Sequence, residues 1–189
     1  YDPEPLAWKH LAIWMGNNHR IKLNATEPMN ITDLDAKKWP IAAITGIGAL
    51  ELSTDEQAAL RRYFKSGGKL IADSCGGDQT FTRAIERVIG PLVESGRRRT
   101  IAPHIALNGP AKIKRVYYRR SLSNKLGSNK TQPRISGILR DRIPVVIYSR
   151  YDLTTGLAGY EGFSLQGYKP QSAFPVITNL LCDLARVKP

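Results

Sequence analysis

The residues best suited to chemistry in this chain of 189 residues surround a cysteine at a break in an apolar run. The run 69–74 ends at Cys75, and a helical pattern begins shortly afterwards at Gln79. This order predicts a strand, a tight turn and a helix, with the thiol at the bend. Because the first N–H groups of a helix favour negative charge, we expect a lowered pKa for the Cys75 thiol. The turn then suits a nucleophile or an anion-binding loop; the alternative is a half-buried cysteine packed for its size.

A nucleophilic cysteine needs a base, and the chain has three histidines, His10, His19 and His104. We take His104 as the candidate, in a loop or short strand beyond the helix. Asp73 or Asp78, which flank the thiol, would orient the imidazole or bind a cation through oxygen ligands. The alternatives are a surface histidine, and an Asp78 that only caps the following helix.

The surrounding elements are predicted to alternate between strands and helices. Strands are expected at 20–23, 41–45, 69–74 and 143–148, and helices at 5–15, 54–66, 79–89 and 174–185. This alternation predicts an α/β fold, a three-layer sandwich with a mainly parallel central sheet. Loops at the carboxyl ends of parallel strands share one rim, where ligands gather. The candidate ligand-binding residues on that rim are Gly46, Gly48, Gly76, Gly77, Asp78, Gln79, Tyr151 and Asp152.

The net charge of +12 comes from one segment. Between Ser95 and Arg140 there are twelve Lys and Arg residues and no Asp or Glu, whereas basic and acidic residues balance elsewhere. Tyr117 and Tyr118 lie among them and could stack on bases. The segment predicts binding of nucleic acid, another polyanion, an acidic protein or a membrane surface; the alternative is a solvated, partly mobile insertion over 95–140. The candidate polyanion-binding residues are Arg97, Arg98, Arg99, Lys112, Lys114, Arg115, Arg119 and Arg120.

Composition predicts a single soluble domain, with no apolar run long enough to cross a bilayer. Cys75 and Cys182 form neither a disulfide framework nor a zinc pattern, and we expect no cofactor and no metal. The start, Tyr1-Asp2-Pro3, is typical of a piece excised from a longer protein. Other domains of that parent are therefore candidate partners.

Two family resemblances add to these expectations. The stretch 70–79 resembles the nucleophile strand of class I glutamine amidotransferases, Gly-x-Cys-x-Gly-x-Gln: Cys75, Gly77 and Gln79 match, and Asp73 replaces the first glycine. Residues 5–186 resemble a bacterial domain of unknown function family, number 4159, thought to share the amidotransferase-like, flavodoxin-like fold. The supporting stretches are 39–46, 60–68, 70–81 and 143–153. The family has no established activity, and its bacterial origin makes the periplasm or cell envelope one option for location.

The chemistry of the amidotransferases does not transfer with the resemblance, because this chain has no late His-Pro-Glu motif to serve the thiol. We therefore expect a non-catalytic module that binds a ligand or a protein. One alternative is a cysteine-dependent hydrolase or transferase that uses Cys75 and His104. The other is a polyanion or nucleic-acid binder that uses the basic residues over 97–140.

Overall fold

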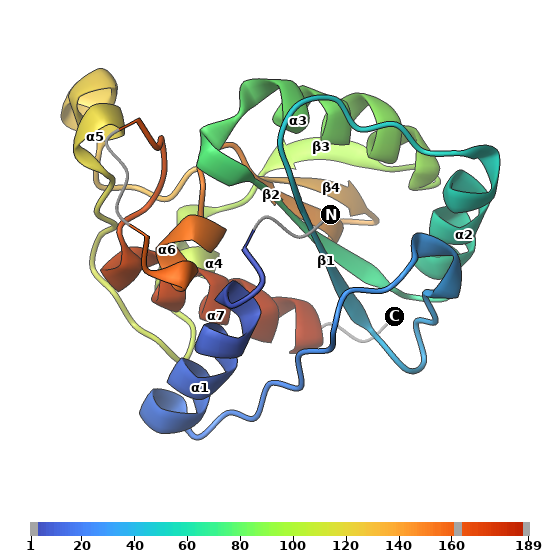
Figure 1. Cartoon of the computed structure of the whole chain (residues 1–189), viewed down its shortest axis with the longest axis horizontal. Coiled ribbons are helices and arrows are strands. Elements are labelled where there is room, and N and C mark those ends of the chain that lie inside the picture. The colour runs from blue at the N-terminus through green and yellow to red at the C-terminus, as the bar shows by residue number, and fades with distance from the viewer. Residues whose placement is uncertain (1–3, 161–163, 187–189) are drawn as a thin grey trace.

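A five-stranded mixed sheet forms the centre of the computed structural model, which describes residues 4–160 and 164–186 (Figure 1). The strand order is β1-β2-β5-β4-β3. The pairs β1–β2 and β2–β5 are parallel, and β5–β4 and β4–β3 are antiparallel. The strands are β1 (Ile41–Gly46), β2 (Lys69–Ser74), β3 (Arg97–Thr100), β4 (Ile135–Arg140) and β5 (Ile143–Ser149).

The three strands predicted from apolar runs form the parallel part of the sheet, which confirms that prediction. β2 lies between β1 and β5, and all six of its residues are buried. A strand covered on both faces needs apolar side chains on both, which explains its run of Leu70, Ile71 and Ala72. Since β1, β2 and β5 are parallel, their carboxyl ends meet at one rim of the sheet.

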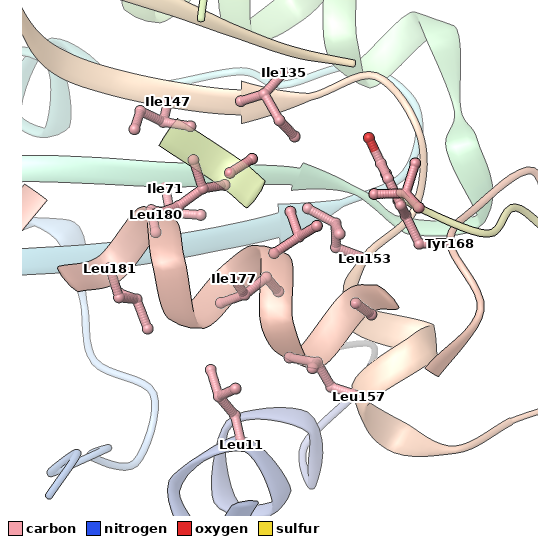
Figure 2. Close-up of a cluster of buried hydrophobic side chains, with 14 of the residues drawn as sticks. Leu11, Ile71, Ile135, Ile147, Leu153, Leu157, Tyr168, Ile177, Leu180 and Leu181 are labelled. Carbon is pink, nitrogen blue, oxygen red and sulfur yellow. The ribbon is translucent and has the colours of Figure 1, made fainter. Parts of the chain in front are cut away.

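Helices cover both faces of the sheet. One face carries α1 (Ala7–His19), α4 (Pro103–Leu107), α6 (Thr154–Ala158) and α7 (Pro170–Arg186). Figure 2 shows α7 beneath the strands, with Leu180 on the side that faces the sheet and Leu11 of α1 on the other side of the helix. Burial of these aliphatic side chains holds this layer on the sheet.

The opposite face carries α2 (Thr54–Lys65), α3 (Gln79–Ala84), the π-helix η3 (Ile85–Ile89) and the 3₁₀ turn η4 (Gly90–Leu92). A capping box begins α2: Ser53 accepts the Glu56 N–H, and the Glu56 carboxylate accepts the Ser53 N–H. The remaining short elements are η1 (Ile31–Asp33), η2 (Cys75–Gly77), α5 (Arg120–Leu126) and η5 (Gly127–Asn129).

Two expectations differ from the structure. No strand forms over 20–23, where α1 continues to His19 and an extended chain follows without a partner strand. The segment 95–140, expected as an insertion, supplies β3, β4, α4 and α5. Apolar anchors such as Val116, Leu122 and Ile138 are buried and hold it in place.

No helix within the described ranges is long and apolar enough to span a bilayer.

Candidate functional site

Cys75 lies at the carboxyl end of β2, in a turn that two glycines complete. Gly76 and Gly77 have φ angles of 67° and 78°, in the left-handed region that favours glycine. A Cβ on Gly77 would also collide with the backbone carbonyl of Gln166. The main chain of Gln166 holds the turn by donating its N–H to the Gly76 carbonyl at 3.1 Å. The predicted strand, tight turn and helix are thus confirmed.

The hydrogen-bond partner of the thiol is Glu4, which lies near the N-terminus, before α1. Cys75 Sγ donates to Glu4 Oε1 at 3.2 Å, and Thr155 Oγ1 donates to the same oxygen at 2.6 Å. Glu4 is only 5% exposed, and Cys75 is half-buried. The stretch before α1 therefore covers the thiol with a carboxylate.

Two further buried carboxylates join the loops that follow β2 and β5. Asp73, on β2, accepts the N–H groups of Leu153 and Thr154, after β5, at 3.0 and 2.8 Å. Asp152, after β5, accepts the Gly76 N–H, after β2. The loop after β5 thus donates to a carboxylate at the end of β2, and the loop after β2 donates to a carboxylate in the loop after β5. Since a buried N–H needs an acceptor, this exchange fixes the two loops relative to each other.

Burial and these carboxylates together determine the pKa of the Cys75 thiol. Burial raises the pKa of Cys75 to about 12, and Glu4, Asp152 and Asp73 act in the same direction. The expected lowering of this pKa by the helix N-terminus is therefore wrong: removal from water and three acidic neighbours outweigh it. Burial also raises the pKa values of Asp73 and Asp152 above the ordinary range of a carboxyl group.

Asp78 and Gln79, two of the predicted rim residues, join the loops that surround Cys75. Asp78 caps α3 by accepting the Thr80 N–H at 2.7 Å, as one alternative expected, and it also accepts the Gly48 N–H from the loop after β1. Gln79 Nε2 donates to the carbonyls of Gly77 and Arg150, which join the β2 and β5 loops.

Two more rim residues serve packing. The Phe81 ring packs so closely on Gly46 that a Cβ there would overlap it. Tyr151 packs its ring edge-on against Tyr118, at 5.9 Å between centroids.

His104 lies apart from the thiol's contacts. It is exposed in the first turn of α4, a short helix that packs against α7. Among the described residues, no hydrogen bond joins His104 to Cys75, whose partner is Glu4. Sequence reasoning missed Glu4, because a single acidic residue before the first helix carries no signal that it will reach the end of β2.

Glu4, Cys75 and Asp152 are the residues here that could share a metal ion. One potential ligand atom from each lies within 4.8 Å of the others. The hydrogen bonds among Glu4, Thr155, Cys75 and Asp152 already account for this proximity, so the cluster by itself does not define a metal centre.

The predicted basic residues lie on different elements and differ in burial. Arg97, Arg98 and Arg99 lie on the edge strand β3, where Arg98 pairs with Glu86. Arg119 is only 8% exposed and donates to the Tyr160 carbonyl, so it lies inside the molecule. The remaining candidates, Lys112, Lys114, Arg115 and Arg120, are exposed along the chain between α4 and the start of α5.

The family model for a domain of unknown function, DUF4159, matches residues 1–182. The match spans nearly the whole chain, so the protein belongs to this family. A search of the curated proteins finds no match.

Proposed function

We propose that this domain is a non-catalytic binding module on an α/β scaffold. The observation that supports it is the environment of Cys75, whose thiol proton is donated to Glu4 at 3.2 Å. The thiolate is the nucleophilic form of cysteine, and burial together with three neighbouring acidic groups opposes its formation. A cysteine hydrolase needs the opposite arrangement, with an imidazole or a cation beside the sulfur that stabilises the thiolate.

The binding surface that we propose is the outer part of the rim. Asp78 holds the loop that contains Ile47 against α3 through the Gly48 N–H. Ile47, at this loop, leaves 55% of its surface exposed. A fixed loop with an exposed aliphatic side chain suits contact with a protein or ligand, because little conformational entropy is lost on binding.

Hydrolysis assays test the non-catalytic assignment. The protein and its Cys75→Ala variant are compared on glutamine and on an activated ester. We expect equal rates, because burial and the neighbouring acidic groups keep the sulfur in its weakly nucleophilic thiol form. A rate well above that of Cys75→Ala would contradict the proposal and favour a cysteine hydrolase. In that case a matching loss in His104→Ala would identify the base.

A further inference from the structure

A shallow hollow lies beside the first turn of α7, and none of its lining residues belongs to the rim. Its volume is about 560 Å³, and it is lined by Ile113, Lys114, Arg115, Tyr117 and Gln171. Lys112 precedes these residues and is also exposed. We call this set of six residues the Tyr117 surface.

The Tyr117 surface combines exposed positive charge with an accessible aromatic ring. Tyr117 leaves 39% of its surface exposed, and the guanidinium of Arg115 lies 4.9 Å from the ring centroid. Arg115 Nε also donates to the Tyr117 hydroxyl at 2.9 Å, which fixes the cation beside the ring. No acidic residue occurs anywhere between Ser95 and Arg140, so these cations have no neighbour of opposite charge in their own segment.

The backbone that carries these side chains is held at several points. Ser172 accepts the Tyr117 N–H at 2.8 Å, and the Tyr117 carbonyl accepts the Lys169 N–H at 2.9 Å. Val116 is buried, and Asn179 of α7 binds both backbone groups of Ala111. The cations and the ring are therefore presented from a fixed chain, which lowers the entropic cost of binding.

The mixture of groups distinguishes between classes of polyanion. A sulfated glycan or an acidic protein needs only the cations. The exposed Tyr117 ring, in a hollow that Ile113 also lines, adds a place where a flat heterocycle can stack. Lys112, Lys114 and Arg115 lie close enough along the chain to contact successive phosphates.

We propose that the Tyr117 surface binds single-stranded nucleic acid, with a base on the Tyr117 ring and phosphates on Lys112, Lys114 and Arg115. This activity is separate from the proposed role of the rim, since the two surfaces share no residue. The proposal therefore stands or falls independently of the chemistry of Cys75.

The test is fluorescence anisotropy of a labelled 12-nucleotide single strand with the whole protein, at sodium chloride concentrations from about 50 to 300 mM. Contacts with three phosphates predict that the logarithm of the affinity falls with the logarithm of salt with a slope of about −2. Tyr117→Leu, which removes the stacking face, is expected to weaken binding on the order of tenfold, and Tyr117→Phe to retain it.

The matched control removes two positive charges from the Tyr117 surface in one variant and two from β3 in another. Lys114→Gln with Arg115→Gln is expected to weaken binding and to make the salt slope shallower. Arg97→Gln with Arg99→Gln removes the same charge from β3 and should leave affinity within about twofold. Equal losses in the two double variants, unchanged affinity in Tyr117→Leu, or no binding at 50 mM salt would each overturn the proposal. Thermal melts of all variants confirm that they are folded.

Discussion

The protonation state of Cys75 at the rim depends on burial and on a few buried acidic residues. Glu4 and Cys75 are 71 positions apart, and their contact adds to burial in raising the pKa of the thiol. The local sequence around Cys75 correctly predicted the turn and the glycines that complete it. It could not predict the pKa of the thiol, because that depends on side chains delivered by tertiary packing, from before α1 and after β5.

Asp73 should make stability fall with rising pH. Burial, and next the charge of Asp152, raise its pKa in the folded chain. The folded protein thus keeps a proton that the unfolded chain releases near pH 4, so the free energy of unfolding decreases from about pH 4 upward through the raised pKa. We expect Asp73→Asn, which cannot titrate, to flatten this decrease in urea denaturation measured from about pH 5 to 8. Asp141→Asn, at an exposed position, should follow the wild-type curve, and a wild-type stability that rises over this range would contradict the account.

At the scale of elements, strands and helices were predicted where burial imposes a pattern on the sequence. The apolar runs of β1, β2 and β5 are of this kind. β3 was missed because its sequence is Arg-Arg-Arg-Thr, and an edge strand with exposed side chains needs no apolar alternation. The strand expected at 20–23 was wrong because apolar spacing alone does not supply a partner strand.

Helix α7 fixes the connection after α4 through one buried amide. Asn179 accepts the Ala111 N–H at 3.0 Å and donates to the carbonyls of Ala106 and Ala111, both at 2.9 Å. Asn179→Leu leaves three buried backbone groups without partners, so we expect a loss of about 2 to 4 kcal/mol in the free energy of unfolding.

Thr178, the preceding residue on α7, provides the control for this prediction. Its hydroxyl is buried and makes no hydrogen bond, so Thr178→Val should be neutral or slightly stabilising. Urea denaturation compares the two variants. Similar losses in both would show that the Asn179 hydrogen bonds do not hold this connection.

At the scale of the whole molecule, the alternation of strands and helices predicted an α/β sandwich, and the parallel part of the sheet with helices on both faces is confirmed. The antiparallel half was not predicted, because the charged segment that supplies β3 and β4 was interpreted as an insertion. Net charge says little about fold, since surface strands and loops tolerate it equally. It does predict how the protein responds to salt.

Moderate salt should stabilise this protein. A net charge of +12 repels itself in the folded state, and counterions screen that repulsion. The ion pairs Lys9–Glu27 and Arg98–Glu86 lie at the surface, although the Glu86 side chain is only 21% exposed, so screening them removes little. We expect Tm to rise when sodium chloride increases from about 20 to 200 mM, as followed by circular dichroism. A falling Tm would mean that attractive surface pairs outweigh the repulsion.

The pH dependence of alkylation at Cys75 tests the central claim, that this thiol is not a nucleophile, most directly. Iodoacetamide labelling is followed by mass spectrometry of the peptide that contains Cys75, so that Cys182 does not contribute. With its pKa raised to about 12, Cys75 should react far more slowly at pH 7 than an ordinary thiol, and its rate should still be rising at pH 10. Glu4→Gln, which removes the nearest negative charge, should shift the profile to lower pH, whereas Glu27→Gln should not. A wild-type profile that levels off below pH 8, with fast labelling at neutral pH, would contradict the account.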